Sequence, residues 1–320
     1  MKIVEVRKFG GPEVLQIVEE ADASPGAGQI AIDVKAAGIN FADIMAREGI
    51  YPGVPSAPFR PGYEIAGVVT ARGAGVEGFP EGARVMAFVP SGGYTSRIVV
   101  NAADVIPLPD ALDFAQATAL LVQGLTAYFL LEVGDIQPSR TVLIAGAAGG
   151  LGSLAIQIAK LKGAGKVIGL ASPSKHERVR SLGAEAAVDY TQSGWSQQVL
   201  AETGGQGIDI FLDSQGDLGS EAFDALGQKA HWLIYGGQGM RGNVLPQERL
   251  GMMIGKNITL RGYSLFGDVA NFRRGLTELF GWVTSGRLQI DVHRFPLAEV
   301  ARAQEAISNR QTTGKIVLEP

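Results

Sequence analysis

The 320-residue chain contains no cysteine and only three histidines. Disulfides and thiolate metal sites are therefore excluded, and no metal is expected because the usual soft ligands are missing. The chain has 28 Lys and Arg residues against 32 Asp and Glu residues, which gives a net charge of −4. Because binding to a phosphate backbone needs clustered cations, nucleic acid is not an expected partner.

Long hydrophobic runs are also lacking. The most apolar stretch, residues 117–131, is interrupted by Gln123, Gly124 and Thr126 and is shorter than the about 20 residues that cross a bilayer. It is typical of a buried helix, so we expect no membrane span. Residues 1–7 alternate charged and apolar side chains like a strand and lack the apolar core of a secretion signal, so we expect a cytoplasmic protein.

The order of patterns along the chain indicates an α/β protein. With 46% hydrophobic and 19% charged residues, the composition is that of a globular chain long enough for about two domains. Up to about residue 109, short alternating runs broken by glycine and proline are typical of β structure. From residue 114 onward helical and strand patterns alternate, which predicts a parallel sheet covered by helices on both faces. The strands predicted for this sheet are 141–145, 166–171, 186–188, 208–213, 230–235 and 258–262.

A glycine ladder, G-A-A-G-G-L-G at 146–152, follows the apolar run 141–145 and precedes the amphipathic segment 154–161. This order predicts strand, glycine turn and helix. Glycines at such a turn allow positive φ and let backbone N–H groups approach a diphosphate, whose charge the helix N-terminus favours. The pattern therefore predicts a bound dinucleotide, although the same glycine spacing also occurs in ordinary tight turns.

The segment after the second strand of this sheet favours NADPH over NADH. An acidic residue at the strand end usually binds the ribose hydroxyls of NAD, and residues 166–172 contain none. Ser172 suits an N-cap and Pro173 the first helical position, which places Lys175 in the first helical turn. A cation there is unfavourable unless an anion, such as a 2′-phosphate, lies nearby. Alternatively, Lys175 and Arg178 are only solvent-facing charges on an exposed helix.

Four separated segments resemble the zinc-free quinone oxidoreductases of the medium-chain dehydrogenase/reductase superfamily, which include zeta-crystallin. They are A-A-G-I-N-F-A-D-I-M-A-R-E-G-I-Y-P at 36–52, F-R-P-G-Y-E-I-A-G-V-V at 59–69, E-G-A-R-V-M-A-F at 81–88, and the glycine ladder. The similarity extends to the closing T-G-K-I-V-L at 313–318. Residues 39–51 and 171–190 look closest to the branch of quinone oxidoreductase and vesicle amine transport protein 1.

The resemblance implies a GroES-like, β-rich catalytic domain, built from both chain ends around an inserted Rossmann domain with a doubly wound parallel sheet. The expected limits are 1–117 for the first part of the catalytic domain, 118–262 for the Rossmann domain and 263–320 for the return. It also implies a homodimer formed by pairing of the edge strand at 258–262.

Departures from the zinc-bearing members imply a zinc-independent enzyme. Tyr63 stands where those enzymes have a histidine ligand, and no cysteine is available for the other ligands. Their cysteine-rich lobe is also missing, because residues 89–94 run directly into the next strand.

Without zinc, hydride transfer to a quinone or an activated C=C bond is easier than oxidation of an alcohol, since only the charge developing on oxygen needs stabilisation. The resemblance implies Asn40 and Tyr51 as donors to a substrate carbonyl. Asn40 could equally cap a helix that starts at Phe41, with Asp43 as the reciprocal partner. Tyr51 could be a packing aromatic in a turn, although related enoyl-thioester reductases use a tyrosine in the same context as proton donor.

The resemblance also implies a set of cofactor-binding residues. One member of this set, Tyr190, has an alternative role, which is only to cover the edge of the sheet. The three histidines receive no role. The implied set is Gly146, Ala148, Gly149, Gly150, Leu151 and Gly152 at the diphosphate, Ser172, Lys175 and Tyr190 at the adenosine phosphate, Gly236 and Gly237 near the nicotinamide, Arg310 as a C-terminal contact, and Phe266 at the substrate end.

The leading hypothesis is an NADPH-dependent reductase of quinones or α,β-unsaturated carbonyls. An enoyl-thioester reductase is the alternative enzyme. A third hypothesis, of another class, is an NADPH-binding sensor or structural protein with little turnover.

Overall fold

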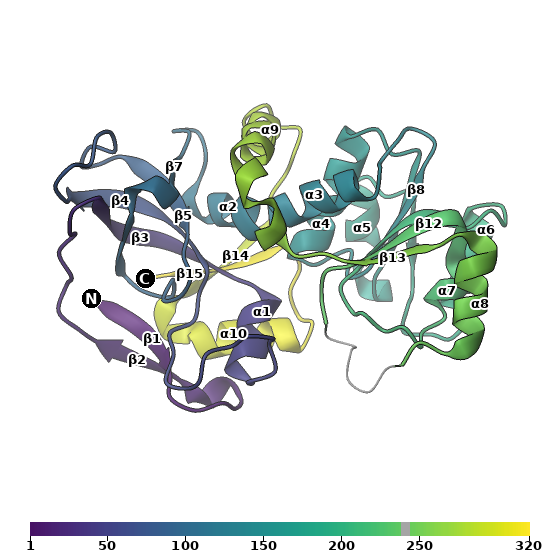
Figure 1. The fold of residues 1–320 in the computed structure, drawn as a ribbon, viewed down its shortest axis with the longest axis horizontal. Coiled ribbons are helices and arrows are strands. Elements are labelled where there is room, and N and C mark those ends of the chain that lie inside the picture. Colours follow the sequence, from purple (N-terminus) through teal and green to yellow (C-terminus); the bar gives the residue numbers. More distant parts are fainter. Residues whose placement is uncertain (238–243) are drawn as a thin grey trace. The chain divides into compact units, whose positions relative to one another are not determined.

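The computed structural model describes residues 1–237 and 244–320 of the chain. The chain divides into two compact units. The first consists of Met1–Gln123, Leu279–Gly286 and Ile290–Pro320, and the second of Gly124–Glu278 and Arg287–Gln289. Both chain termini therefore belong to the first unit, as the purple and yellow ends of the ribbon show (Figure 1).

This division differs from the expected domain limits mainly at residues 263–278, which fall in the second unit. The reason is packing on α3 (Leu125–Val133). Arg274 donates to both carboxylate oxygens of Glu132, at 2.8 and 2.7 Å. A Cβ added to Gly275 would lie 2.7 Å from the Leu125 side chain. The start of α9 (Phe272–Thr284) is thus closely packed against this helix.

The first unit contains a separate two-stranded sheet of β1 and β2, and a seven-stranded sheet to which the N-terminal and C-terminal parts of the chain both contribute. The strand order of the larger sheet is β14-β15-β3-β4-β5-β7, and β6 pairs with β3. The C-terminal β15 pairs antiparallel with β3 from the N-terminal part, which confirms the expected return of the chain. The strands of this unit are β1 (Lys2–Val6), β2 (Leu15–Glu19), β3 (Gln29–Ile39), β4 (Glu64–Arg72), β5 (Arg84–Phe88), β6 (Arg97–Asn101), β7 (Val105–Pro107), β14 (Val292–Pro296) and β15 (Lys315–Glu319).

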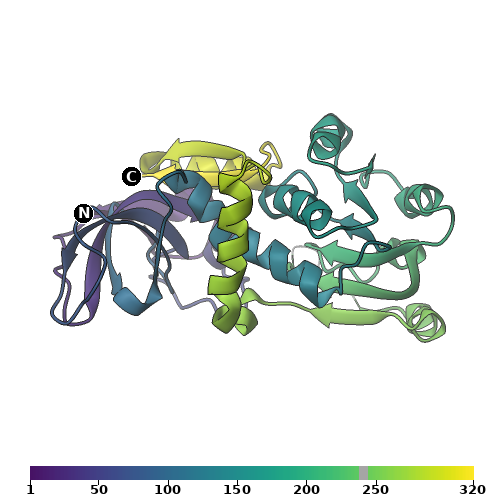
Figure 2. The same ribbon diagram turned by 90° about the horizontal axis from the view of Figure 1, so that it is seen from above.

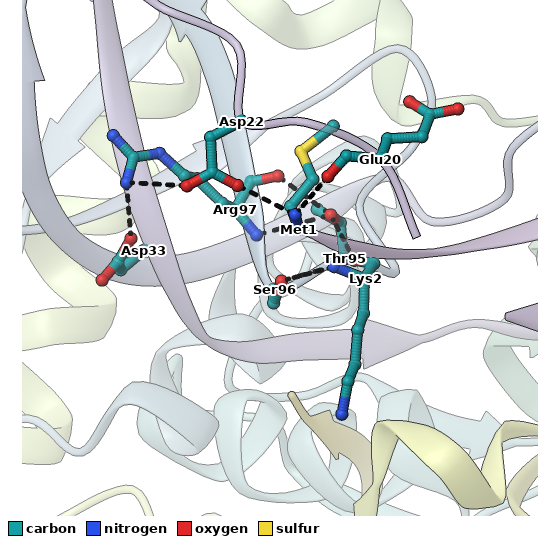
Figure 3. Close-up of polar contacts among 8 residues, drawn as sticks. All are labelled: Met1, Lys2, Glu20, Asp22, Asp33, Thr95, Ser96 and Arg97. Carbon is teal, nitrogen blue, oxygen red and sulfur yellow. Dashed lines mark hydrogen bonds and ion pairs between the residues drawn. The ribbon is translucent and has the colours of Figure 1, made fainter. Parts of the chain in front are cut away.

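Hydrogen bonds from the start of the chain attach β1 to the segment that leads into β6 (Figure 3). The Ser96 N–H donates to the Lys2 carbonyl oxygen, and the Lys2 N–H donates to Ser96 Oγ, both at 2.9 Å. The Met1 ammonium lies 2.8 Å from Asp22 Oδ1, and Arg97 lies 3.4 Å from the other oxygen of the same carboxylate. Exposed ion pairs of this kind stabilise little, so the backbone contact is the more important restraint.

Few helices accompany this sheet. Asp113 caps α2 by accepting from the N–H groups of Ala115 and Gln116. Apart from the end of α9 and the π-helical turn described below, the helical segments of the unit are η1 (Pro12–Val14), α1 (Phe41–Arg47), η2 (Ala102–Asp104), α2 (Phe114–Ala119), η6 (Leu297–Glu299) and α10 (Val300–Ser308).

One helix of the described chain, Phe114–Val133, is long and apolar enough to cross a membrane by length and composition alone. It comprises α2, a π-helical turn η3 (Leu120–Gly124) and α3. The sequence argument from the short length of residues 117–131 is wrong, because the helix extends beyond both ends of that stretch. Since 78% of its most apolar window is buried in the structure, the interpretation as a buried helix is confirmed.

The second unit contains a six-stranded, fully parallel sheet in the order β10-β9-β8-β11-β12-β13. The order reverses between β8 and β11, and helices cover both faces of the sheet (Figure 2). This is the doubly wound arrangement expected from the sequence, in which ligands bind at the carboxyl ends of the strands near the reversal. The strands are β8 (Thr141–Ile144), β9 (Lys166–Leu170), β10 (Ala186–Val188), β11 (Ile208–Asp213), β12 (Leu226–Ile234) and β13 (Thr259–Gly262).

The strands of this sheet follow the continuous apolar runs typical of parallel strands that are buried on both faces. Val142, Leu143 and Ile144 of β8 have no exposed surface. β12 begins four residues before its predicted start. The prediction missed these residues because their sequence, Leu-Gly-Gln-Lys, is not an apolar run. The remaining helical segments are α4 (Gly150–Leu161), η4 (Pro173–Lys175), α5 (His176–Ser181), α6 (Trp195–Glu202), α7 (Ala222–Ala225), α8 (Gln247–Lys256) and η5 (Leu265–Asn271).

Candidate functional site

The glycine ladder forms the turn between β8 and α4, as the sequence predicts. Gly146 has a φ of +61°, a conformation that favours glycine. A Cβ added to Gly152 would overlap the Gly146 carbonyl oxygen and lie 2.7 Å from Ala147 Cα. These two glycines are therefore required by the turn itself, which lies at the carboxyl end of β8 beside the reversal of strand order.

The N-terminus of α4 supplies the donors of this turn. Gly149 is the N-cap, with extended backbone, so Gly150, Leu151 and Gly152 are the first three helical residues. The first N–H groups of an α-helix have no acceptor within the helix, and together with the helix dipole they favour an anion. Ala148 precedes this group and is buried. The backbone donors of the turn can thus hold a diphosphate.

A second loop approaches the same turn from the end of β11. The Asp213 carboxylate accepts hydrogen bonds from the N–H groups of Gln215 at 2.7 Å and Gly216 at 3.1 Å. The indole N–H of Trp232 donates to it at 2.9 Å. Burial raises the pKa of Asp213, and these three donors oppose that rise. Sequence reasoning missed this residue, although an acid that ends a buried apolar strand is a detectable signal.

The Ser214 backbone explains the first of the two glycines after β12. A Cβ added to Gly236 would overlap the Ser214 carbonyl oxygen, and one added to Gly146 would lie 3.5 Å from Ser214 Oγ. Ser214 therefore lies between two of the segments that the sequence assigned to the cofactor. Gly237 follows Gly236 and is half-buried.

The predicted phosphate-binding residues lie after β9. Ser172 is the N-cap of the short 3-10 helix η4, Pro173 is its first residue and Lys175 its last, so the predicted helix start is confirmed. The first turn is 3-10 rather than α-helical, and α5 begins only at His176. The imidazole Nε2 of His176 forms a hydrogen bond with the Ala171 carbonyl oxygen at 3.0 Å, which is a structural contact.

Tyr190 follows β10, an edge strand of the parallel sheet. Its half-buried ring packs against the hydrophobic cluster that fills one side of this sheet. The structural role considered for Tyr190 is therefore present, and its contact with a cofactor stays a prediction.

In the first unit, Asn40 precedes α1 and forms a capping box with Asp43, whose carboxylate accepts from the Asn40 N–H at 2.7 Å. The Asn40 amide is held as well. Nδ2 donates to Glu64 Oε1 at 2.7 Å, and Oδ1 accepts from Lys315 at 3.0 Å and from Gln123 at 3.1 Å. The structural role considered for Asn40 is confirmed, and its role as a substrate donor stays a prediction.

The side chains that hold Asn40 form a buried ion pair. Glu64 and Lys315 are 0% and 1% exposed and contact each other directly. Lys315 Nζ also donates to the Ile39 carbonyl oxygen at 3.1 Å, and Glu64 Oε2 accepts from the Val122 N–H in the π-helical turn at 2.9 Å. Buried charges of this kind require such partners. Sequence reasoning missed both residues, although each is a lone charge within an apolar strand pattern.

Asp43 is itself fully buried. Burial raises the pKa of its carboxyl to about 7, against the opposing effect of the hydrogen bond from the Asn40 backbone. Asp43 Oδ1 and the Tyr94 hydroxyl are buried, and within the described residues neither has a hydrogen bond of normal geometry.

Tyr51 is half-buried and packs against a small cluster that includes Val6 and Phe59. Burial, and to a lesser extent the charge of Asp43, raise the pKa of its hydroxyl. The phenol is therefore protonated at neutral pH and can donate a proton or a hydrogen bond. The packing role is present, and the catalytic role stays a prediction.

Tyr63, at the position of a zinc ligand in zinc-bearing enzymes, stacks on Phe88 with ring centroids 6.4 Å apart. Burial raises the pKa of its hydroxyl to about 12. In the part of the chain that the structure describes, no three His, Cys, Asp or Glu side chains are grouped so that they could hold a metal ion.

Two other predicted site residues are exposed. Phe266 in η5 has 57% of its surface exposed. Arg310, just after α10, is exposed and has a φ of +56°. Their contacts with a cofactor or substrate stay predictions.

Comparison with known families gives two matches within the chain. The alcohol dehydrogenase GroES-like domain matches residues 26–110. The family described as zinc-binding dehydrogenase matches residues 182–318.

Individual relatives cover the whole chain. A quinone oxidoreductase of Salmonella typhimurium is 36% identical over 99% of this chain and 99% of its own. The human synaptic vesicle membrane protein VAT-1 homolog is 30% identical over 98% of this chain and 84% of its own. The crystal structure of Escherichia coli quinone oxidoreductase complexed with NADPH superposes with a TM-score of 0.91, at 33% identity over all of both chains.

Proposed function

Because the chain belongs to the zinc-free quinone oxidoreductase branch of the medium-chain dehydrogenase/reductase superfamily, we propose that it is an NADPH-dependent reductase of quinones or α,β-unsaturated carbonyls. The observation that carries the proposal is the glycine turn between β8 and α4. A Cβ at position 152 would overlap the Gly146 carbonyl oxygen, so only glycine allows the turn that presents the N–H groups of this helix N-terminus. The residues present therefore fit the diphosphate of a dinucleotide.

In the second unit, the N–H groups of Gly150, Leu151 and Gly152 would hold the diphosphate. Ser172 and Lys175, a hydroxyl and a cation after the next strand, would hold the 2′-phosphate that distinguishes NADPH from NADH. When bound, NADPH supplies a hydride from its nicotinamide C4. We therefore assign these cofactor-binding residues to the second unit and the substrate donors Asn40 and Tyr51 to the first.

In the first unit, Asn40 and Tyr51 would act on the substrate oxygen. The amide of Asn40 donates a hydrogen bond that stabilises the negative charge developing there as hydride arrives. The protonated phenol of Tyr51 holds the proton that this oxygen or the adjacent carbon needs. With Tyr63 in place of a histidine ligand, these neutral donors take the role of a metal ion in stabilising charge.

The proposal is tested by following oxidation of NADPH and NADH with 1,4-benzoquinone, 9,10-phenanthrenequinone, a simple enone and crotonyl-CoA. We expect turnover of a quinone or the enone with NADPH, and much slower turnover with NADH. Turnover confined to crotonyl-CoA would favour an enoyl-thioester reductase. Tight NADPH binding without turnover of any acceptor would favour a binding protein.

We further propose a homodimer formed through β13, which is an edge strand of the parallel sheet. Three of its four residues are exposed, so its outer edge can pair with another strand. The helix that precedes β13, α8, has two exposed apolar side chains one turn apart. Leu250 is 50% exposed and Ile254 is 72% exposed, so both are available to a partner chain. Sedimentation velocity of the full chain is expected to give a dimer, and a monomer at micromolar concentration would contradict the proposal.

We also propose that the protein acts in the cytoplasm, since the cell supplies NADPH there. Fractionation of the native host, with detection by antibody, is expected to recover the protein with cytoplasmic enzymes. Recovery with membranes would contradict this location.

A further inference from the structure

The Asn40 amide is bound at both of its ends by buried groups. Its carbonyl oxygen accepts two hydrogen bonds, from the Lys315 ammonium at 3.0 Å and from the Gln123 amide at 3.1 Å. Its nitrogen donates to the Glu64 carboxylate at 2.7 Å. A single helix cap would need none of these three contacts, so capping does not account for them.

The ion pair lies alongside the Asn40 amide. The Lys315 ammonium contacts the amide oxygen, the Glu64 carboxylate contacts the amide nitrogen, and the two charges also contact each other. Both are at most 1% exposed, so water screens them little. Donors on the carbonyl oxygen of an amide draw electron density away from its nitrogen, and hydrogen bonds in such a chain strengthen one another. The two donors on Oδ1 therefore make the N–H groups of Asn40 stronger donors than they would be without these contacts.

One of these N–H groups remains available. A side-chain amide carries two hydrogens, and within the described residues the Glu64 carboxylate is the acceptor of one. Asn40 is buried, with 7% of the residue exposed. The three hydrogen bonds and the capping box fix its orientation, and a donor fixed in advance costs no reorganisation during the reaction.

We propose that Lys315 and Gln123 polarise the Asn40 amide, so that its second N–H stabilises the negative charge that develops on the substrate oxygen. Lys315 and Gln123 are thus positioning residues that act through Asn40, and Glu64 is the counter-ion that makes a buried ammonium possible. This inference rests on the proposed function, in which Asn40 donates to the substrate.

The test removes the charges while it keeps the shape of the network. Replacement of Lys315 alone would leave a buried, unpaired carboxylate and endanger folding. The double variant Glu64→Gln/Lys315→Met is therefore made twice, once in the wild-type background and once in an Asn40→Ala background. We expect kcat with the best acceptor to fall about tenfold in the first background, a part of the effect of removing a whole oxyanion donor. In the Asn40→Ala background the exchange is expected to change kcat less than about twofold, and Kd for NADPH to stay unchanged in both.

A second variant keeps the ion pair intact. Gln123→Met removes one of the two donors to Asn40 Oδ1, and we expect kcat to fall by roughly threefold to fivefold, again only when Asn40 is present. The control is Arg84→Met. Arg84 donates to the Leu112 carbonyl oxygen and lies over the Phe114 ring at 4.0 Å, so its replacement is expected to lower Tm and leave kcat unchanged.

The results separate this inference from the proposed function. If the wild-type chain oxidises no NADPH with any acceptor, the proposed function fails and the inference with it. If the wild type is active but the exchanges lower kcat equally in both backgrounds, or do not lower it at all, the polarised amide is refuted while the reductase stands. If the paired exchange does not fold, the Gln123→Met result in the two backgrounds decides.

Discussion

Asp43→Asn is expected to change how the stability of the protein depends on pH. The substitution removes a charge and keeps the shape of the side chain, and an asparagine oxygen can still accept the 2.7 Å hydrogen bond from the Asn40 N–H. In the folded protein, burial raises the pKa of the Asp43 carboxyl to about 7. In the unfolded chain an aspartate titrates near a pKa of about 3.9.

The sign follows from which state holds the proton more tightly. Because the folded pKa is the higher one, the contribution of Asp43 to stability is fully present below about pH 4 and is lost as the pH rises to about 7. The shift of about 3 pKa units corresponds to about 4 kcal/mol at about 1.36 kcal/mol per unit. About 3 kcal/mol of this falls between pH 5 and pH 8. The Asp43→Asn variant has no carboxyl to ionise at this position and escapes this loss.

The assay is urea unfolding of both proteins at pH 5, 6, 7 and 8, with the free energy of unfolding extrapolated to water. The stability of the variant relative to wild type is expected to rise by about 3 kcal/mol from pH 5 to pH 8. Titration of all other groups cancels in this difference. A difference that is the same at every pH would show that the Asp43 carboxyl titrates like an exposed one, and it would refute the argument from burial.

Three further substitutions test the two halves of the site. Lys175→Ala is expected to weaken NADPH binding by about tenfold to a hundredfold, the value of a charge-assisted hydrogen bond, and NADH binding little. Arg180→Ala on the exposed side of α5 is the control, and equal losses for both nucleotides would remove the phosphate argument. Tyr51→Phe is expected to lower kcat by about a hundredfold or more, as loss of a proton donor does, with unchanged affinity for NADPH. Unaltered kinetics would assign the tyrosine to packing. Gly152→Val is expected to abolish NADPH binding because its Cβ overlaps the Gly146 carbonyl, whereas Gly251→Ala, in open space, is expected to bind normally.

The features that the sequence predicted well are local ones. The glycine turn, the N-cap at Ser172 and the capping box of Asn40 and Asp43 are each decided within a few residues, by backbone conformation and by the nearest donors. The parallel sheet with helices on both faces followed from the alternation of strand and helix patterns, because parallel strands must be joined by crossover connections.

The features that it missed depend on contacts between distant residues. Lys315 and Glu64 are 251 residues apart in the chain, and no local pattern says which charges will meet in the interior. The buried helix was expected over the apolar stretch 117–131, and in the structure it runs over Phe114–Val133. It includes a π-helical turn, where the Glu64 carboxylate accepts the Val122 N–H, a contact that no local pattern indicates.

The central claim, that the turn between β8 and α4 binds the diphosphate of NADPH, is tested most directly by isothermal titration calorimetry of the full chain. We predict one NADPH bound per chain, with an affinity well above that for NADH. The absence of binding heat from both nucleotides at millimolar concentration, with a folded protein, would contradict the account.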